Sequence, residues 1–422
     1  MTDATAPTPK PSLLAGWFAT PLWIRIVGAM ILGALVGLGI GDGAKELKII
    51  GDVFVEAIRM LVVPLIFATI TAGVVAIGSP KALGRTGGWT IGFYVVTSVL
   101  AVCLGLLLGS LFQPGAGLDL VPSVTPETTA PPTWQELLLG VIPENPVKAM
   151  AEGQALPIIA FAVLFGLGLL MAGDKAKPTS AAIDGAAEAL LRLVGVVMEL
   201  APFGVFALMA FVVGTLGVEA LVPLLALVGV VYLALFLHAT LVYGSAIKFL
   251  AGLPVLPFYR GMLDAMAVAY STSSSNATLP VTMRCCTENL GVPQAKTSFV
   301  TSLGATIHMD GTAIYLALVT TFGAQVFGVE LGPAQLVMIV LTATLGAIGA
   351  AGVPGGSFVM MPLVLGAGGV PLEVIPIILA VDRVMDMART VVNVLGDATC
   401  AVAVSKWDGD LDEDVYRGRD VA

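Results

Sequence analysis

The chain contains 422 residues, of which 57% are hydrophobic and only 12% are charged. Soluble proteins carry about 25% charged residues, so this composition indicates a polytopic, all-α membrane protein. The net charge is −9, and no basic stripe of the kind that binds nucleic acid is present. The four cysteines have neither zinc-type spacing nor a disulfide framework. We therefore expect a lipid bilayer as the surroundings, with no nucleic-acid partner and no cofactor.

The first half of the chain has the pattern of successive membrane spans. Residues 1–20 are polar and rich in proline, and they lack the pattern of a signal peptide. Crossing a bilayer takes about 20 apolar residues. Runs of this kind predict spans at 21–42, 51–77, 87–112, 135–173, 181–216 and 220–250. Prolines interrupt the fourth span, and residues 113–134 have no periodic pattern and predict a loop.

The second half contains two segments that read as hairpins. Residues 271–278, a run of Ser, Thr, Asn and Ala, separate two apolar arms at 254–270 and 279–290, each too short to cross. Residues 334–370 repeat this design with a glycine-rich tip. Basic residues flank only the first hairpin, so we expect the two to enter the membrane from opposite sides. Such inverted repeats are typical of secondary transporters.

The distribution of Lys and Arg predicts the orientation. Basic residues are absent from 86–147 and from 297–382, and they gather in short polar connections and in the C-terminal tail. Cytoplasmic loops carry an excess of Lys and Arg. We therefore expect a multi-pass protein of the cell inner (plasma) membrane, with the loop at 113–134 outside and both termini in the cytoplasm.

One face of the last predicted span concentrates polar side chains. Their spacing of i, i+4, i+7, i+8, i+11 and i+15 puts them within a helix face about 100° wide. They are Asp382, Asp386, Arg389, Thr390, Asn393 and Asp397. A charge at the bilayer centre costs at least ~2.5–3.5 kcal/mol. The stripe therefore predicts a substrate, ion or water path, and a purely structural salt-bridge stripe is the alternative.

Five short motifs carry a family resemblance. They are Ser273-Ser274-Ser275, Thr278-Leu279-Pro280, Met309-Asp310-Gly311-Thr312, Ala351-Gly352-Val353-Pro354 and Asp386-Met387-Ala388-Arg389-Thr390-Val391-Val392-Asn393. In this order and spacing, from about residue 20 to 407, the chain resembles the glutamate/aspartate transporter family, the dicarboxylate/amino acid:cation symporters. The resemblance implies eight transmembrane helices plus two re-entrant helical hairpins, inverted repeats, a homotrimer and an elevator-type mechanism.

The resemblance also implies a division of the chain. A cytoplasmic segment at 1–20 precedes scaffold helices 1–2 at 21–86, transport-domain helix 3 at 87–112 and an external loop at 113–134. Scaffold helices 4–5 follow at 135–217. The rest of the transport domain covers 218–407, with helix 6, hairpin 1, helix 7, hairpin 2 and helix 8. A cytoplasmic tail occupies 408–422.

The chemistry of the polar residues fits a ligand with one amine and two carboxylates. The guanidinium of Arg389 suits bidentate capture of a carboxylate, and Asp386, one turn earlier, can hold an ammonium group. The resemblance assigns Arg389 to the side-chain carboxylate, Asp386 to the α-amine, and Asn393, Ser275 and the Val353 backbone to the α-carboxylate. The full expected substrate set is Ser273, Ser274, Ser275, Thr312, Gly352, Val353, Asp386, Arg389, Thr390 and Asn393.

Three sodium sites are implied by the same resemblance. The first uses Asp397, Asn393 and the carbonyls of Gly304 and His308. The second uses Thr306, Met309 and the carbonyls of Ala347, Ile348 and Ala350. The third uses Asp310, Thr97, Ser98 and the Tyr94 carbonyl. Oxygen ligands of these kinds suit a hard cation.

His308 is a departure, because sodium-coupled relatives usually carry Asn at this position. A histidine beside Asp310 can carry a proton near physiological pH, can act as a neutral hydrogen-bond donor, or can belong to a modified sodium site.

Three further features concern other positions. We expect His238 to be a structural histidine. Leu316 replaces a proton-accepting glutamate of neuronal relatives. Ser273 and Met387 stand where relatives carry a second arginine, for which Arg383 is a candidate substitute.

These features predict a symporter for an acidic amino acid, aspartate or glutamate, coupled to sodium, protons or both. A C4-dicarboxylate symporter is one alternative, although Asp386 would then face another anion. A neutral amino acid exchanger is a second, disfavoured by Arg389. An intramembrane enzyme with Asp382 and Asp386 as a dyad lacks supporting motifs, and we expect no enzyme. A passive anion pore would conduct without a cation gradient.

Overall fold

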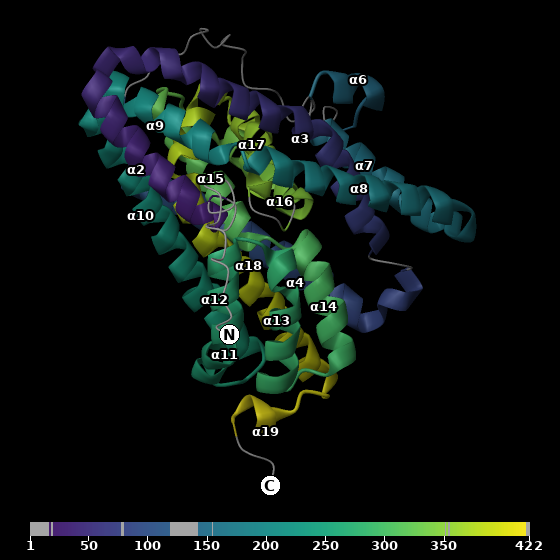
Figure 1. The fold of residues 1–422 in the computed structure, drawn as a ribbon. Coiled ribbons are helices and arrows are strands. Elements are labelled where there is room, and N and C mark those ends of the chain that lie inside the picture. Colours follow the sequence, from purple (N-terminus) through teal and green to yellow (C-terminus); the bar gives the residue numbers. More distant parts are fainter. Residues whose placement is uncertain are drawn as a thin grey trace, which may run out of the picture.

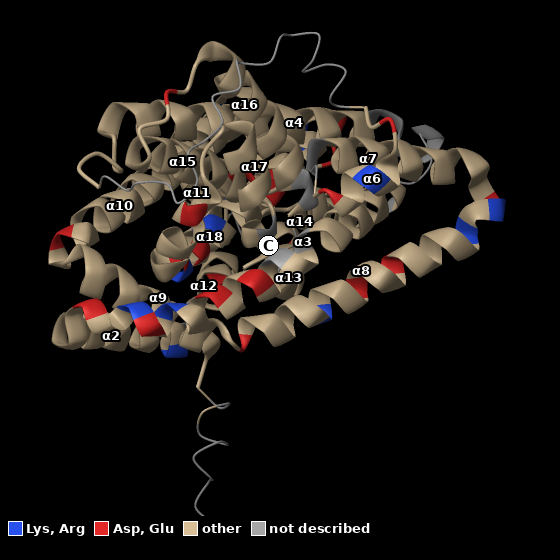
Figure 2. Ribbon diagram, turned by 90° about the horizontal axis from the view of Figure 1, so that it is seen from above, with Lys and Arg blue, Asp and Glu red and all other residues tan. Residues whose placement is uncertain are grey.

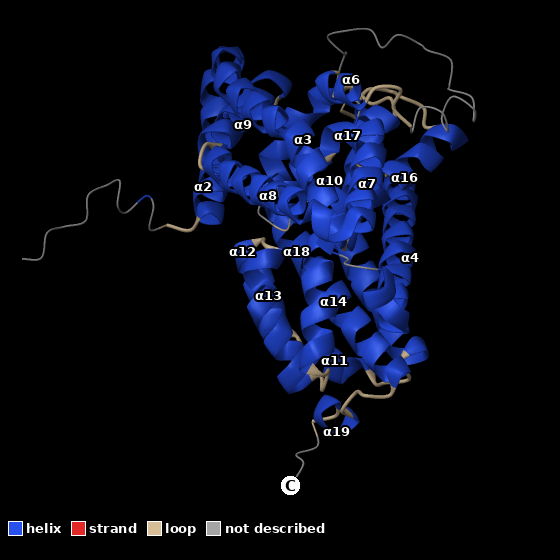
Figure 3. Ribbon diagram, turned by 90° about the vertical axis from the view of Figure 1, so that its right-hand side faces the viewer, coloured by secondary structure: helices blue, strands red, loops and turns tan. Residues whose placement is uncertain are grey.

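The structure, a computed structural model, describes residues 17, 20–76, 80–118, 142–153, 155–350, 352 and 355–418. Every regular element within these residues is a helix (Figure 3). The expected loop at 113–134 and the segment at 1–20 lie mostly outside the described residues. Val353, an expected backbone contact to the substrate, also lies outside them.

Long apolar helices make up the first half of the chain. By length and composition, four segments of the described chain can cross a membrane: Ile24–Val75, Thr86–Phe112, Pro157–Met198 and Val218–Leu250. The helices in this half are α2 (Leu22–Ile40), η1 (Gly41–Leu47), α3 (Lys48–Ala76), α4 (Pro80–Phe112), α6 (Pro146–Ala151), α7 (Ala155–Ala172), η2 (Gly173–Ala176), α8 (Lys177–Met198), α9 (Ala201–Leu216), η3 (Val218–Ala220), α10 (Leu221–Leu237) and the π-helical η4 (His238–Tyr243) and η5 (Ala246–Leu250).

The expected continuous span at 181–216 is two helices in the structure. α8 ends at Met198 and α9 begins at Ala201, with Pro202 in its first turn. Proline has no N–H to donate to the preceding turn, and it is tolerated where a helix starts. The apolar composition continues through the break, which explains why hydrophobicity alone indicated one span.

Two helical hairpins and an interrupted helix form the second half. Hairpin 1 has its tip between α12 and α13, at residues 273–274, and hairpin 2 has its tip between α16 and α17, at residues 350–360. The elements are α11 (Val255–Gly261), α12 (Leu263–Thr272), α13 (Ser275–Arg284), η6 (Cys285–Asn289), α14 (Gln294–Ile307), α15 (Asp310–Val326), α16 (Pro333–Gly349), η7 (Gly356–Val359), α17 (Met361–Ala367), η8 (Leu372–Val374), α18 (Ile375–Asp408) and α19 (Glu413–Tyr416). The chain is non-helical at His308 and Met309, between α14 and α15.

The helices pack as two groups. α2, α3, α7, α8 and α9 pack mainly against one another, whereas α4, α10 and α12 to α15 surround α18. In Figure 1, α2, α3 and α9 lie across the upper part, and α11 to α14 and α19 lie in the lower part. Figure 2 shows basic and acidic residues along α8 at the rim and further charges around α18 in the interior. Helix α18 therefore brings its polar stripe to the centre of the second group.

Glycines allow α2 and α9 to approach closely. A Cβ at Gly33 would collide with the carbonyl oxygen of Phe206, and one at Gly37 with that of Ala210. The two glycines are four residues apart and both are buried. Small residues at this spacing let helix backbones touch in membranes, where packing rather than hydrophobicity drives helix association.

We expect Gly37→Leu to destabilise the protein, because the added side chain must separate α2 from α9. Overpacking of this kind costs about 1–3 kcal/mol. Gly39→Leu is the matched control, since no atom lies within 4 Å of a Cβ at exposed Gly39. Thermal unfolding of the purified proteins in detergent measures both. Equal melting temperatures for the two variants would contradict the close contact.

Candidate functional site

The polar stripe predicted on the last span faces the interior. Its six side chains are 1% to 6% exposed, although they lie on a 34-residue helix, α18. Asp382 and Arg389 are 1% exposed and Asp386 is 6% exposed. Charges buried this deeply need partners. The contacts of each charge therefore define the site.

Arg389 lies between two carboxylates of its own helix. Its Nη1 donates to Asp382 Oδ1 at 3.0 Å, and its Nη2 donates to Asp386 Oδ1 at 2.7 Å. The guanidinium carbon also lies 3.9 Å from the centroid of the Tyr315 ring, a cation–π geometry. Arg383 Nη1 lies 3.4 Å from the second oxygen of Asp386. The cluster thus contains two positive and two negative side chains.

The tips of the two hairpins meet above this cluster. Ser273 has left-handed backbone angles, φ 52° and ψ 36°, and ends α12. The Ser274 side chain caps α13 by accepting from Ala277 N, and its Oγ donates to the carbonyl of Gly352 at 2.7 Å. Asn276 N donates to the same carbonyl at 3.1 Å. Hairpin 1 and hairpin 2 are therefore joined directly at Gly352.

A second contact ties hairpin 2 to α18. Gly355 N donates to Asp386 Oδ2 at 3.2 Å, and Gly355 has φ +76°, a conformation that favours glycine. The carboxylate of Asp386 therefore contacts Arg389, Arg383 and the tip of hairpin 2 at once. Asp386 links the charged cluster to the segment that covers it.

A small polar cavity lies under the two tips. It has about 10 Å³ of space for water, roughly one molecule. The side-chain oxygens of Ser273 and Ser357 are buried without a hydrogen-bond partner among the described residues. The residues that line the cavity are Ser273, Ser275, Met309, Thr312, Gly352, Ser357, Asp386, Thr390 and Asn393. Seven of the ten expected substrate residues thus line this one cavity. Arg389 does not line it but hydrogen-bonds to Asp386, which does.

Asp310 is surrounded by four polar side chains, of which Ser98, His238 and Tyr243 hydrogen-bond to it. Ser98 Oγ donates to its Oδ1 at 2.6 Å, and Tyr243 OH donates to its Oδ2 at 2.9 Å. The Nε2 atoms of His238 and His308 each lie 3.1 Å from Oδ2. His238, expected to be structural, is thus a direct partner of the expected third ion site, and Tyr243 is a further partner that its position in an apolar span did not indicate.

His308 bridges two buried carboxylates. Its Nε2 lies 3.1 Å from Asp310 Oδ2 and 2.9 Å from Thr97 Oγ1, and its Nδ1 lies 3.1 Å from Asp397 Oδ1. The Tyr94 ring stacks on the imidazole with centroids 4.0 Å apart. The imidazole therefore fills the space between the residues expected for the first and third sodium sites.

Glycines make room for this bridge. A Cβ at Gly396 would lie 2.5 Å from Tyr243 OH and would collide with His308 Cε1. At Gly304 a Cβ would collide with Asp397 Oδ1. Gly311 N donates to Asn393 Oδ1 at 2.8 Å, which orients that amide beside the same region.

The expected second ion site lies where two helix ends approach each other. α14 ends at Ile307, just after Thr306, and α16 ends at Gly349, just after Ala347 and Ile348. Ala350 continues in an extended conformation, and the carbonyl oxygen of Ala305 lies 2.8 Å from the Cβ position of Gly352. Carbonyls at helix C-termini carry partial negative charge. The arrangement suits a cation.

Comparison with known proteins identifies the family of this chain. The model of the "Sodium:dicarboxylate symporter family" matches residues 22–407. The chain is 37% identical over 404 residues to the "Proton/sodium-glutamate symport protein" of Geobacillus stearothermophilus, covering 93% of this chain and 95% of the relative. The chain belongs to the sodium:dicarboxylate symporter family.

Other relatives of this symporter differ in the substrate that their names state. The "Proton/glutamate-aspartate symporter" of Escherichia coli (strain K12) is 36% identical over 92% of this chain and 93% of its own length. The "C4-dicarboxylate transport protein" of Bacillus subtilis (strain 168) is 34% identical over 93% and 94%. The symporter is thus a cation-coupled, polytopic membrane transporter and not an enzyme, as the sequence predicted.

Two contacts of Arg389 in the symporter site were also not predicted from the sequence. Asp382 was recognised as part of the stripe, yet its pairing with Arg389 was not, although the i, i+7 spacing places both on one face. Tyr315 lies on α15, and only the packing of α15 against α18 brings its ring to Arg389. No local pattern in the sequence indicates that second contact.

We expect Arg389→Gln to destabilise the symporter, because Asp382 loses its buried charged partner. Breaking a buried ion pair costs roughly 3–5 kcal/mol. Adding Asp382→Asn removes the orphaned charge and should recover part of the loss in a thermal melt. Arg192→Gln is the control, since its pair with Glu188 is exposed. A melting temperature unchanged by Arg389→Gln would exclude the pairing as a stabilising contact.

Proposed function

We propose that this symporter moves an acidic amino acid, aspartate or glutamate, inward together with sodium and a proton. The supporting observation is the juxtaposition of Asp386 with Arg389 at a cavity closed by two hairpin tips. An arginine suits a carboxylate, and Asp386 suits an ammonium group. Backbone N–H groups at the hairpin tips suit a second carboxylate. An α-amino dicarboxylate presents all three groups.

A C4-dicarboxylate is the second candidate, because relatives with that name are 34% to 35% identical. Such a substrate has no amine, so Asp386 would face another anion with only the arginines to compensate. A neutral amino acid would leave Arg389 without a ligand carboxylate. The charge of the site therefore favours the acidic amino acid.

Uptake by the purified protein in liposomes tests this function. Labelled aspartate should accumulate when an inward sodium gradient is imposed, and excess glutamate should compete better than succinate. Flux that continues without any cation gradient would indicate a passive pore. Accumulation of labelled succinate with no response to aspartate would overturn the proposal in favour of a dicarboxylate carrier.

Asp386→Asn should weaken binding of aspartate much more than binding of succinate. The loss of a charge-assisted contact to a buried group is expected to cost about 2–5 kcal/mol, and only the amino acid makes that contact. Titration calorimetry with both ligands in saturating sodium measures the difference. Equal losses for the two ligands would remove Asp386 from amine recognition.

Movement of hairpin 2 is the proposed route by which substrate enters. The cavity is too small for an amino acid, and two hydrogen bonds of the described tip residues cross the site: the Gly352 carbonyl accepts from Ser274 Oγ, and the Gly355 amide donates to Asp386. Lids of this kind carry glycines that permit large backbone changes. We infer that the tip opens to the outside and closes over the bound substrate.

A disulfide between the tips should abolish uptake. Asn276→Cys and Gly352→Cys suit this test, because the Cβ position of Gly352 lies 2.9 Å from Asn276 Oδ1. The background carries Cys103→Ser, since Cys103 is exposed and the other three cysteines are buried. Reduction should restore uptake, and each single variant should be insensitive to oxidation. Full uptake after verified cross-linking would rule out this gate.

Proton coupling is proposed from the position of His308. A neutral imidazole has one N–H, whereas a protonated one has two. The Nδ1 of His308 hydrogen-bonds with Asp397, and its Nε2 lies 2.9 Å from Thr97 Oγ1 and 3.1 Å from Asp310 Oδ2, so a protonated ring can donate from both nitrogens while its charge lies between the two carboxylates. Its single positive charge leaves one negative charge over, which suits a sodium ion beside Asp397. In this proposal, the proton on His308 replaces the sodium ion expected at the third site, beside Asp310.

His308→Asn should shift the coupling from pH towards sodium. The neutral amide oxygen can serve as a ligand for a sodium ion at Asp310, whereas the imidazole offers a proton. Uptake by the wild type should respond to an inward pH gradient, and uptake by the variant should depend more steeply on sodium. Thr320→Val is the control, because the buried Thr320 hydroxyl donates to the Leu316 carbonyl of its own helix, α15. Wild-type uptake that requires sodium equally from about pH 5 to 8, with identical behaviour of the variant, would refute the coupling.

The elevator mechanism, the homotrimer and the orientation are also proposed. The group of α2, α3, α7, α8 and α9 would be the scaffold, and the group around α18 the moving transport domain. Their separate packing supports this division. The remaining sodium ions would bind at Asp397 and between the ends of α14 and α16. Basic residues support cytoplasmic termini.

A further inference from the structure

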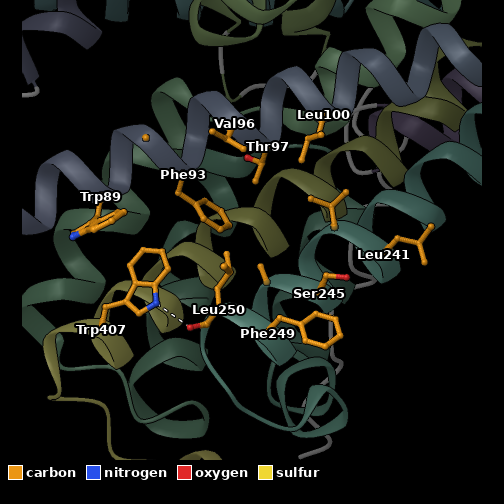
Figure 4. A pocket seen from close by; sticks show the side chains of 13 residues that line it. Trp89, Phe93, Val96, Thr97, Leu100, Leu241, Ser245, Phe249, Leu250 and Trp407 are labelled. Carbon is orange, nitrogen blue, oxygen red and sulfur yellow. Dashed lines mark hydrogen bonds between the residues drawn. The ribbon is translucent and has the colours of Figure 1, made fainter.

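A large apolar groove lies on the outside of the second helix group. It has a volume of about 990 Å³ and runs between α4 on one side and η4 and η5 on the other. Figure 4 shows Phe93 and Val96 of α4 facing Leu241 and Phe249 across it. Both walls belong to segments apolar enough to span a membrane, Thr86–Phe112 and Val218–Leu250. In this membrane protein, the groove therefore faces hydrocarbon.

One end of the groove has the features of a membrane–water interface. The Trp89 and Trp407 rings lie there with centroids 4.9 Å apart, and Trp407 Nε1 donates to the carbonyl of Leu250 at 2.9 Å (Figure 4). Lys248 is exposed and lies in η5 together with Phe249 and Leu250 of the groove wall, and its ammonium is 6.0 Å from the centroid of the Phe249 ring. Tryptophan concentrates at the level of lipid headgroups, and lysine there attracts anionic lipid.

The groove shares its inner wall with the cluster around Asp310. Thr97 lines the groove and its Oγ1 lies 2.9 Å from His308 Nε2. On the other wall, Leu241 and Val242 directly precede Tyr243, whose hydroxyl donates to Asp310. The second wall is π-helical, a rare form that is frequent at functional sites. An occupant of the groove would therefore press on both elements that hold the cluster.

We propose that this groove binds the acyl chain of an anionic phospholipid, with its phosphate at Lys248. The apolar walls suit the chain, the tryptophan pair suits the glycerol level, and the exposed lysine suits the negative headgroup. The volume is within the range of small-molecule sites, about 300–1,000 Å³. The bound lipid packs between α4 and the π-helical wall and stabilises the position of both.

Filling the groove tests the chain-binding part. Gly92 lines the groove and is exposed, and no atom lies within 4 Å of a Cβ there, so Gly92→Phe adds bulk to the groove without a local collision. Gly229→Phe is the matched control on α10, since Gly229 is equally exposed and open but does not line the groove. Native mass spectrometry of the full chain in detergent, with added phosphatidylglycerol or phosphatidylcholine, counts bound lipid.

The wild type and Gly229→Phe should retain phosphatidylglycerol, and Gly92→Phe should retain about tenfold less, because the added ring displaces acyl methylenes that would otherwise be buried in the groove. Retention by Gly92→Phe equal to that of the control would overturn the proposal. A thermal melt without lipid checks that both variants fold.

Lys248→Gln tests the headgroup part without altering the interior. Its affinity for phosphatidylglycerol should fall about fivefold, as expected for one basic residue at the surface, and its weaker binding of phosphatidylcholine should not change. Lys175→Gln, an exposed lysine in η2, should bind both lipids as the wild type does. Equal retention of the two lipids by the wild type would overturn the proposal. These measurements do not involve transport, so they stand apart from the test of substrate and coupling ion.

Discussion

The imidazole of His308 lies between the carboxylates of Asp310 and Asp397, with one ring nitrogen 3.1 Å from an oxygen of each. Two carboxylates buried this closely repel each other unless a positive charge or several donors separate them. Three elements contact the ring: Thr97 and Tyr94 lie on α4, Asp310 on α15 and Asp397 on α18. A fourth element, η4, contributes Tyr243, which donates to Asp310. The packing of the second helix group therefore converges on one ring.

That convergence explains local features that otherwise look unfavourable. The chain between α14 and α15 is non-helical at His308 and Met309, and His308 has extended backbone angles. Glycine at 396 and 304 leaves space that any side chain would fill. Each of these features weakens a helix on its own. Together they permit a buried polar network whose members are nearly all hydrogen-bonded, which is the condition for keeping charge inside a membrane protein.

At the substrate site, too, buried charges are paired with side chains of the protein itself. Arg389 and Arg383 pair with Asp382 and Asp386, so the side chains of the cluster leave no uncompensated charge. In the proposed function, a ligand carboxylate and ammonium replace these internal contacts. Because Asp386 also accepts from Gly355 N, occupancy of the site and the position of the hairpin 2 tip depend on the same carboxylate. The hydroxyls of Ser273 and Ser357 have no hydrogen-bond partner among the described residues, and in the proposed function they are available to the ligand.

The sequence by itself determined the membrane class, most of the helices, the two hairpins as polar breaks between short apolar arms, and the stripe on α18. These are local properties: hydrophobic length, helical spacing and the backbone freedom of serine- and glycine-rich tips. It also carried the family resemblance, which the comparisons confirmed. The break between α8 and α9 was missed, because hydrophobicity continues through it and only Pro202 signals the new helix start.

Only the tertiary structure decided which charges meet. His238 is 72 residues from Asp310 and Asp397 is 89 residues from His308, and no spacing rule relates such positions. The spacing of the stripe predicts that Asp382 and Arg389 share a helix face. The structure adds that the two side chains form an ion pair and that the Tyr315 ring of α15 packs on the guanidinium. Likewise, the groove lies between α4 and the π-helical wall. The sequence of an apolar span is the same whether its neighbour is another helix or lipid, so the sequence did not predict this groove.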